Sequence, residues 1–247
     1  MYLRDCNVIL KIIFSLRFLQ KMSSVELHSR HMYDGRIHHP STMLICGPSG
    51  SGKTHFTQNL LEYGEELFKP KKPAFTILIY DTWQNNYDDM LTKSLIDLTI
   101  KGLPDIDYLK EIFEEHKENG GTLLLIDDQM QNIDQNVVNI FTIYSHHMKV
   151  TCILLTQSLF LSNKAYRTIS LNTHYIILMK NTRDSSSVTQ LAKQTHPFRT
   201  RFITDSYIEA TKHPYSYLMF DLRQETPEVI RIRSNIFSDV NHIYIPK

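Results

Sequence analysis

Residues 43–54 read MLICGPSGSGKT, an apolar run that passes into a glycine-rich turn and ends in Gly52, Lys53 and Thr54. Glycine permits backbone angles and close approaches that a side chain would block. The amide groups of such a turn wrap phosphates at the start of a helix, where the helix dipole favours negative charge. In this pattern the lysine reaches the β- and γ-phosphates, and the hydroxyl that follows it ligates Mg²⁺. The stretch therefore predicts a phosphate loop for a nucleoside triphosphate and Mg²⁺.

The flanks of the loop have the periodicities of a strand and of a helix. Thr42–Cys46 is a run of buried-strand character, and apolar residues recur at helical spacing from Phe56 to Leu67. We expect a helix over His55–Phe68. The expected nucleotide contacts are Gly47, Pro48, Ser49, Gly50, Ser51, Gly52, Lys53, Thr54 and His55.

Length and composition favour one domain. The chain has 247 residues, of which 42% are apolar and 21% charged, as in an ordinary globular protein. We expect a poorly defined N-terminal arm over residues 1–37 and a single domain over residues 38–247. The apolar run Val8–Leu19 is interrupted by basic residues and is too short to span a bilayer, so no membrane partner is expected. It is either an amphipathic helix or an extension upstream of a start at Met22.

Charge is distributed unevenly along the chain. Acidic side chains predominate between Thr54 and Ile140, and basic ones between Lys164 and Arg201, where Asp184 is the single acid. Such a basic region either meets the phosphates of a nucleotide or nucleic acid or is a solvated face.

The cysteines indicate a reducing compartment. The chain has three, too few for a disulfide framework, and Cys46 and Cys152 lie inside apolar runs. We expect both to be buried as small hydrophobic residues. The protein is therefore expected to be intracellular and not secreted.

Further apolar runs of strand length follow the loop and alternate with helical patterns. Each run is nearly continuous, as expected for strands covered by helices on both faces. The alternation predicts an α/β fold with a mostly parallel, doubly wound sheet. The expected strands are Phe75–Tyr80, Thr122–Ile126, Val150–Leu155, His174–Met179 and Tyr217–Leu222, and the expected helices are Tyr108–Lys117, Asn136–His147 and Ser186–Gln194.

Two adjacent acids follow the strand expected over Thr122–Ile126. Such a strand delivers carboxylates to the edge of the sheet where ligands bind in open α/β folds. Asp127 is then placed to hold Mg²⁺ beside Thr54, and Asp128 to orient and polarise an attacking water. An acidic turn is the alternative. A divalent metal would relieve the repulsion between the two carboxylates.

Polar residues also follow the next strands. Gln157 comes soon after Val150–Leu155, where its amide can hydrogen-bond a γ-phosphate or the water. Arg167 and Arg183 flank the strand expected over His174–Met179. The planar fork of an arginine suits the charge that develops on a transferred phosphoryl group, whether its own chain or a neighbour supplies it.

The ordered segments GPSGSGKT, IYDTWQ, GLP, LLLIDDQM, ILLTQSLF and RTISLNTHYIILMKNTRD resemble the FtsK–HerA superfamily of ATPases. Within it, they resemble the genome-packaging ATPases of Polinton/Maverick elements, adintoviruses and related large DNA viruses, over Pro40–Pro197. The resemblance implies a three-layer RecA-like P-loop core that forms a ring, often a hexamer, and hydrolyses ATP to move double-stranded DNA. It also implies capsid or portal proteins as partners and a place in the host nucleus, the host cytoplasm or the virion.

The resemblance carries roles onto matching positions. Lys53 and Thr54 become the nucleotide and Mg²⁺ residues, and Asp127 becomes the metal carboxylate. Asp128 becomes the water-activating acid and Gln157 the sensor. The wider superfamily usually has Glu as its second acid, one methylene longer than Asp128, although the packaging branch commonly has the same Asp-Asp pair.

Several arginines are candidates for contacts with a neighbouring subunit or with DNA. Arg167 is the first choice for an arginine finger that acts across the subunit interface, and Arg183 the second. The pairs Arg199–Arg201 and Arg231–Arg233 are candidate contacts to DNA phosphates, with solvated surface pairs as the alternative.

Two other functions fit the same residues. A small P-loop nucleotide kinase would combine the phosphate loop with an arginine-rich lid, for which Asn181–Arg201 is the candidate segment. Against it, Asp127, Asp128 and Gln157 suit activation of water better than transfer to a second nucleotide. The third candidate is a nucleotide-binding scaffold for capsid or recombination partners that does not hydrolyse ATP.

Overall fold

The structure, a computed structural model, describes residues 34–129, 133–238 and 241–246. The run Val8–Leu19 and most of the expected N-terminal arm lie outside these residues. The short strand β1 (Ile37–His38) crosses the expected domain start at residue 38. Within the described segments, no helix combines the length and apolar character that a membrane crossing requires.

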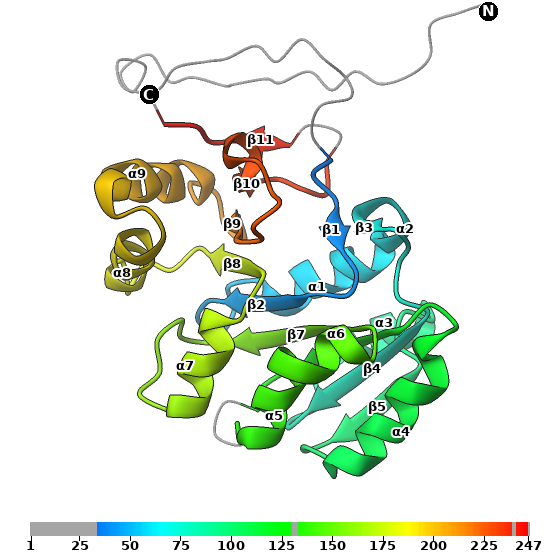
Figure 1. The fold of residues 1–247 in the computed structure, drawn as a ribbon. Helices are drawn as coiled ribbons and strands as arrows, with labels where there is room; N and C mark the ends of the chain where they lie inside the picture. The colour runs from blue at the N-terminus through cyan, green and yellow to red at the C-terminus, as the bar shows by residue number, and fades with distance from the viewer. Residues whose placement is uncertain (1–33, 130–132, 239–240, 247) are drawn as a thin grey trace, which may run out of the picture.

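A mostly parallel sheet forms the middle layer (Figure 1). In the described part of the chain its strand order is β11–β10–β9–β8–β2–β7–β6–β4–β5, and the pairs from β8 to β5 are parallel. Strands β9, β10 and β11 extend it through antiparallel pairs. The strands are β2 (Thr42–Cys46), β4 (Phe75–Tyr80), β5 (Leu98–Lys101), β6 (Thr122–Ile126), β7 (Val150–Thr156), β8 (Tyr175–Met179), β9 (Tyr217–Asp221), β10 (Ile232–Ser234) and β11 (His242–Ile243).

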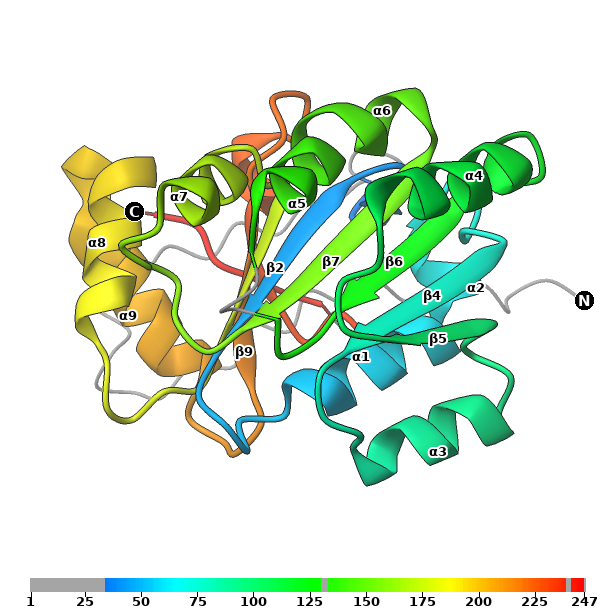
Figure 2. The same ribbon diagram turned by 90° about the horizontal axis from the view of Figure 1, so that it is seen from below.

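Helices cover both faces of this sheet. Figure 2 shows α1, α2 and α3 on one face, α4 to α7 on the other, and α8 and α9 beside α7, near β9. The α/β fold with a mostly parallel sheet between helices, expected from the alternating pattern, is therefore confirmed. The helices are α1 (Lys53–Glu62), α2 (Gly64–Leu67), α3 (Asn85–Thr92), α4 (Ile106–Lys117), α5 (Gln135–Asn139), α6 (Ser145–His147), α7 (Lys164–Leu171), α8 (Ser186–Thr195) and α9 (Thr200–Ala210).

The central strands are continuously apolar because both of their faces are buried. In β2, Met43 and Ile45 pack with side chains of α1 and α3, whereas Leu44 and Cys46 pack with side chains of α4, α5 and α7. Successive strand residues point to opposite faces, so one run of five residues contributes to two cores. The cysteine expectation is also confirmed, since Cys46 and Cys152 are buried free thiols.

Two expected helices are interrupted. The helix expected over His55–Phe68 stops at Glu62, and Phe68 already belongs to the strand β3 (Phe68–Lys69), which pairs with β1. The helix expected over Asn136–His147 begins as α5, passes through a π-helical turn at Ile140–Tyr144 and ends as α6. The pairing of β3 with β1 joins segments about 30 residues apart, which helical periodicity does not encode.

The register brings four loops to one edge. Cys46 is paired with Thr156 of β7 and with Leu178 of β8, and Ile126 of β6 is paired with Leu154. The carboxyl ends of β2, β6, β7 and β8 therefore lie within a few residues of one another. We call this side the carboxyl edge and the opposite side the amino edge.

Candidate functional site

The phosphate loop leaves β2 at Gly47 and enters α1 at Lys53. Gly50 and Gly52 have φ of 74° and 98°, in the left-handed region that glycine adopts with little strain. At Gly47 an added Cβ would lie 2.6 Å from the Cβ of Met179. The backbone shape thus requires the glycines of the predicted motif.

Polar atoms of the loop fit a phosphate ligand. The Ser51 Oγ atom is buried and has no hydrogen-bond partner among the described residues. Lys53 Nζ donates to the carbonyl oxygens of Gly47 at 2.8 Å and of Pro48 at 3.2 Å, so the ammonium group folds over its own loop. Phosphate oxygens are charged acceptors and hydrogen-bond an ammonium more strongly than neutral carbonyls do. The loop can therefore exchange these internal bonds for bonds to a triphosphate.

Asp127, directly after β6, is buried and linked to the start of α1 through Gln84. Thr54 Oγ1 donates to Gln84 Oε1 at 3.2 Å, and Gln84 Nε2 donates to Asp127 Oδ2 at 3.4 Å. The Tyr87 hydroxyl donates to the same carboxylate oxygen at 2.7 Å. The two expected Mg²⁺ ligands, Thr54 and Asp127, thus lie on either side of one amide group. Oxygen donors of this kind suit Mg²⁺.

Lys53 and the two acids of the site shift one another's pKa values. Burial raises the pKa of the Asp127 carboxyl, whereas the Tyr87 hydrogen bond and the charge of Lys53 lower it. Burial lowers the pKa of Lys53, and the charges of both acids, Asp127 and Asp128, raise it. Asp128 is exposed and has φ of 57°, a left-handed conformation that Asp tolerates better than most residues. Both acids therefore lie close enough to the phosphate loop for their charges to act on its lysine.

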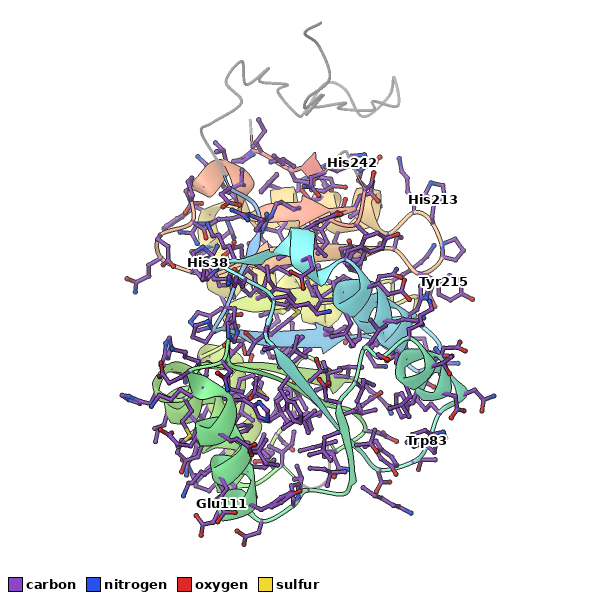
Figure 3. All side chains as sticks on the ribbon, turned by 90° about the vertical axis from the view of Figure 1, so that its right-hand side faces the viewer. His38, Trp83, Glu111, His213, Tyr215 and His242 are labelled. Carbon is purple, nitrogen blue, oxygen red and sulfur yellow. The ribbon has the colours of Figure 1, made fainter. Side chains whose placement is uncertain are left out.

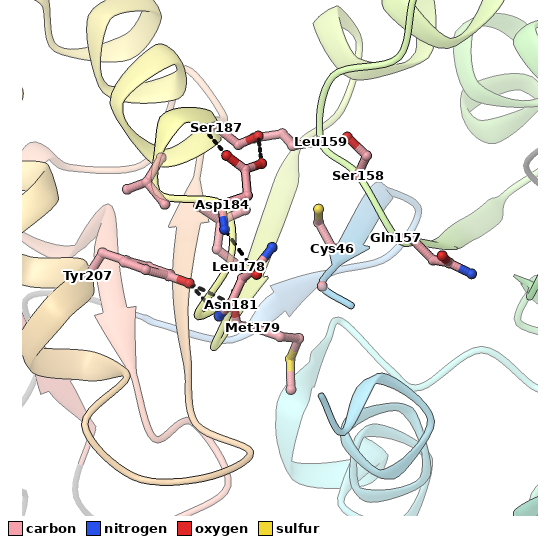
Figure 4. A pocket seen from close by; sticks show the side chains of 12 residues that line it. Cys46, Gln157, Ser158, Leu159, Leu178, Met179, Asn181, Asp184, Ser187 and Tyr207 are labelled. Atoms are coloured by element: carbon pink, nitrogen blue, oxygen red, sulfur yellow. Dashed lines mark hydrogen bonds between the residues drawn. The ribbon is translucent and has the colours of Figure 1, made fainter. Parts of the chain in front are cut away.

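Gln157 follows β7, the strand that separates β2 from β6. Since Cys46 is paired with Thr156, Gln157 comes beside Gly47, and both residues line a small hollow at the carboxyl edge. Figure 4 shows Gln157 on one side of this hollow and Asp184 on the other. The expected sensor position thus lies next to the phosphate loop.

The far wall of the hollow is internally bonded. The Asp184 carboxylate accepts hydrogen bonds from the backbone N–H groups of Ser186 and Ser187 at 3.0 and 3.1 Å and so caps α8. The Tyr207 hydroxyl donates to the carbonyl oxygen of Met179 at 2.9 Å (Figure 4). Burial raises the pKa of the Cys46 thiol to about 12, so this thiol stays protonated and is no nucleophile.

Comparison with known families matches residues 36–163 to the AAA domain. The matched residues include the phosphate loop, the acidic strand β6 and Gln157, and they make up more than half of the chain. The chain belongs to the AAA domain family. This AAA-type P-loop ATPase domain accordingly uses a nucleotide and, as such domains typically do, Mg²⁺. No curated protein sequence matches the chain.

The chain is similar to solved structures of secretion ATPases, one of which aligns closely enough to indicate the same fold. ATPases 2 and 3 of EssC from Geobacillus thermodenitrificans align with a TM-score of 0.51 and 14% identity, over 84% of this chain and 40% of that one. The cytoplasmic domain of the type VII secretion ATPase EccC from Thermomonospora curvata gives a TM-score of 0.45 and 13% identity, over 75% of this chain and 24% of that one. The AAA domain described here spans less than half of the length of these chains.

The two candidate finger arginines lie on the surface of the AAA domain. Arg167 is exposed on α7, and Arg183 is exposed in the turn that follows β8. Neither guanidinium has a hydrogen bond or ion pair with any residue in the described segments. His55, the last expected nucleotide contact, is exposed on the first turn of α1, 3.5 Å from the Asn59 amide. The structure therefore brings the loop residues and acids together and leaves both arginines facing outward.

One candidate DNA contact is wrong. Arg233 is buried and pairs with Asp221 at 3.3 Å, and Arg231 donates to the carbonyl oxygen of Arg223 at 2.7 Å and pairs with Glu228 at 2.8 Å. These arginines stabilise the fold at the amino edge. The physical reason is that Arg233 lies inside β10, a strand whose three residues are all buried, whereas Arg231 lies just before it; the spacing of the two arginines did not show where the strand begins.

Gln84 and Tyr87 were not identified from the sequence. Gln84 closes the segment IYDTWQ soon after β4, and β4 is the neighbour of β6 in the sheet. The sequence did carry one signal for Gln84, since it is a polar residue that follows a strand and that strand lies beside the acidic strand β6. For Tyr87 there was none, because a tyrosine at a buried helix position has the pattern of an ordinary core residue.

Proposed function

We propose that this AAA domain hydrolyses ATP as a ring-forming homo-oligomer and uses the energy to move double-stranded DNA during packaging of a viral or transposon genome. The observation that carries the hydrolytic part is the hydrogen-bonded chain from Thr54 through Gln84 to Asp127. It links the start of the phosphate-loop helix to the acidic strand. The packaging role is supported by the motif resemblance over Pro40–Pro197.

The chemistry divides among a few groups. The amide groups of the loop and Lys53 bind the phosphates, while Thr54 and Asp127 are the ligands for Mg²⁺. When bound, Mg²⁺ neutralises charge on the phosphate oxygens. Asp128, exposed at the same edge, orients water and accepts its proton, and Gln157 hydrogen-bonds the γ-phosphate or that water.

The outward-facing arginines fit a role between subunits. Neither Arg167 nor Arg183 has a charged partner among the described residues. Each guanidinium can therefore bind the nucleotide of a neighbouring subunit without first breaking an ion pair. Arg167 remains the first choice and Arg183 the second. An arginine supplied in trans makes hydrolysis depend on assembly.

Opposite charges at the two ends of the sheet support a ring. Over the end of the sheet that contains β4, β5 and β6, α4 exposes acidic side chains that include Glu111 and Glu115. At the other end, α7, α8 and the start of α9 expose basic side chains; Figure 2 shows these ends on opposite sides of the domain. Contacts between unlike surfaces of identical subunits generate rings when the rotation closes, and opposite charges favour such contacts. The exposed basic residues are Lys164, Arg167, Arg183, Lys193, Arg199 and Arg201.

The contact to DNA is proposed for the turn between α8 and α9. Arg199 and Arg201 are exposed there, beside Phe198, which is 98% exposed. Positive side chains on such a turn bind the DNA backbone without reading its sequence, and the affinity falls as salt rises.

The nucleotide kinase is less well supported. The candidate lid segment Asn181–Arg201 forms α8 and packs through the buried residues Val188, Leu191 and Ala192. A lid has to open and close, and this apolar packing opposes such motion. Only an activity measurement distinguishes the proposed ATPase from a scaffold that binds ATP without hydrolysing it.

Light scattering with and without ATP and duplex DNA, followed by an ATPase assay on the assembled fraction, tests the proposal. We expect a ring-sized species and ATPase activity that duplex DNA stimulates and Lys53→Ala abolishes. Phosphorylation of a nucleoside monophosphate without DNA would instead indicate a kinase. ATP binding without hydrolysis in the assembled, DNA-bound state would indicate a scaffold.

A matched pair of variants separates DNA contact from net charge. The double variant Arg199→Ser, Arg201→Ser should lose most of the DNA stimulation, measured on the ring-sized fraction relative to the ATPase rate of that same fraction without DNA. The control Lys110→Ser, Lys117→Ser removes equal charge from α4 at the other end of the sheet and should keep the stimulation. Equal loss in both variants would contradict the proposed contact.

A further inference from the structure

One aromatic side chain is exposed directly against the phosphate loop. Tyr215 is 64% exposed, and its Cβ and Cδ1 atoms lie 3.2 Å from the position that a Cβ on Gly52 would occupy. Gly52 is the last loop residue before α1, so the ring is adjacent to the helix start that would hold the phosphates. Figure 3 shows Tyr215 at the same edge of the domain as Trp83.

Hydrogen bonds hold the segment that carries Tyr215 against the end of β8. The Lys180 N–H donates to the carbonyl oxygen of Ser216 at 3.0 Å, and Lys180 Nζ donates to that of Lys212 at 2.8 Å. Immediately after this segment, Tyr217 is buried in β9 and its ring contacts that of Phe56 of α1, with centroids 4.8 Å apart. Tyr215 is therefore held in place from both sides while its own side chain faces solvent.

The conformation of Tyr215 is unusual for its residue type. Its φ is 61°, in the left-handed region that is costly for a bulky side chain. Such a conformation persists where the surrounding structure enforces it, and it often marks a functional position. The ring is held beside the loop although its exposure shows that it contributes little to the core.

The strand order sets the direction in which a nucleotide would lie. The acids after β6 and the Gln84 amide after β4 lie on one side of β2, across β7. Tyr215 precedes β9 and lies on the other side of β2, beyond β8. The γ-phosphate has to face Asp127 and Asp128 for water to attack it, so the α-phosphate and the nucleoside point toward Tyr215.

We propose that the Tyr215 ring is the stacking platform for the base of the nucleotide. This inference rests on the proposed function, since it takes the phosphate loop as the triphosphate site. The aromatic face stacks on the base, and Gly52 allows the close approach because it has no side chain to displace the ring. Base–aromatic stacking of this kind changes affinity by roughly 5- to 150-fold when the aromatic residue is removed.

Calorimetric titration with ATP and with inorganic tripolyphosphate, both with Mg²⁺, tests the platform. Tripolyphosphate occupies the loop but has no base. For Tyr215→Asn we expect a roughly tenfold or greater loss of ATP affinity with unchanged tripolyphosphate affinity. Asn accepts the left-handed conformation, so this variant removes the ring without added backbone strain. Tyr215→Phe keeps the ring and should keep the ATP affinity.

Three outcomes would overturn the inference. Unchanged ATP affinity in Tyr215→Asn would show that the base does not stack there. Equal loss of ATP and tripolyphosphate affinity would show that Tyr215 only shapes the phosphate loop. A wild-type chain that binds neither ligand would overturn the proposed function itself, and the inference with it.

Discussion

Two buried aspartates lie at opposite edges of the same sheet and have different partners. Asp127 follows β6 at the carboxyl edge and is 5% exposed, and Asp221 ends β9 at the amino edge and is 0% exposed. Asp221 accepts hydrogen bonds from two guanidinium groups, Arg223 at 2.9 Å and Arg233 at 3.3 Å. Among the described residues, the side chains that hydrogen-bond Asp127 are the neutral Tyr87 hydroxyl and Gln84 amide.

The difference separates a structural acid, Asp221, from the acid that we propose to act in catalysis, Asp127. Two arginines neutralise Asp221, and Arg233 also donates to the carbonyl oxygen of Gly35, which attaches the first described residues to β10. Lys53, the cation whose charge lowers the pKa of Asp127, is hydrogen-bonded to its own loop. A buried carboxylate without a directly bonded cation is costly, and a divalent ion would relieve that cost. Burial is common to both acids, so it is the charge of the partners that distinguishes them.

The largest expected effect is on catalysis by Asp127→Asn. We expect kcat for ATP hydrolysis to fall by about 100- to 1,000-fold, because the site loses its charged metal ligand. The free energy of unfolding should stay the same or rise, since Asn has the same shape and no charge to bury. Steady-state ATPase assays on the assembled protein and thermal unfolding measure the two quantities. A large drop in melting temperature with retained activity would reverse the assignment.

Asp221→Asn should show the opposite pattern. Removing this carboxylate leaves two arginines without their shared partner, and we expect a loss of about 3–5 kcal/mol in the free energy of unfolding. Urea denaturation measures this loss, and ATP binding should persist wherever the variant is folded. Asp205→Asn is the control, because its pair with Arg201 at 3.6 Å is partly exposed and should contribute less than about 1 kcal/mol. Similar losses in both variants would contradict the structural role of Asp221.

Tyr87→Phe tests the neutral donors of Asp127 more finely. The Tyr87 hydrogen bond lowers the pKa of the Asp127 carboxyl, so its loss raises that pKa. We expect the acidic limb of the pH profile of kcat/KM to move to higher pH. Tyr175→Phe removes a buried hydroxyl at the amino edge, where it bonds the His38 N–H at 2.9 Å, and should leave the limb in place. An unmoved limb in Tyr87→Phe would show that Asp127 does not control it.

The smallest expected effect is the contribution of His39, at the amino edge, to the pH dependence of the free energy of unfolding. Burial lowers the pKa of His39 from 6.5 to about 4. Between pH 4 and pH 6.5, His39 therefore binds a proton in the unfolded chain but not in the folded chain. The free energy of unfolding consequently falls as the pH falls from 6.5 toward 4. The contribution of this residue is at most about 1.4 kcal/mol per pH unit.

His39→Asn should flatten this dependence in urea denaturation at several pH values. The exposed His213 serves as the control, since His213→Asn should leave the slope unchanged. A slope in His39→Asn equal to that of the wild type would show that other groups cause the acid destabilisation.

The strands could be predicted where apolar residues are contiguous. The runs that became β2, β4, β6, β7, β8 and β9 are nearly unbroken, because helices cover both faces. The edge strand β5 (Leu98–Lys101) is only partly buried, and β10 (Ile232–Ser234) and β11 (His242–Ile243) are too short to show a pattern. Their pairing depends on the neighbouring strand that is already in place.

The residues of the site also divide into those that could be predicted from the sequence and those that could not. Residues from Gly47 to Thr54 were predicted because one continuous segment forms the cradle, and its shape follows from local backbone geometry. Asp127 was predicted because it follows a recognisable strand. Gln84 and Tyr215 come from segments far away in the chain, and no local pattern links either of them to the phosphate loop.

The amino-acid sequence by itself determined the phosphate loop, the acidic strand and the α/β class, because glycine conformation and apolar periodicity are local properties. The tertiary structure alone decided which groups surround that loop. Strand order placed Gln84 between Thr54 and Asp127, put Tyr215 on the opposite side of the loop and gave the two buried aspartates different partners. The reason is physical, since strand neighbours are chosen by burial of whole faces, which depends on the entire chain at once.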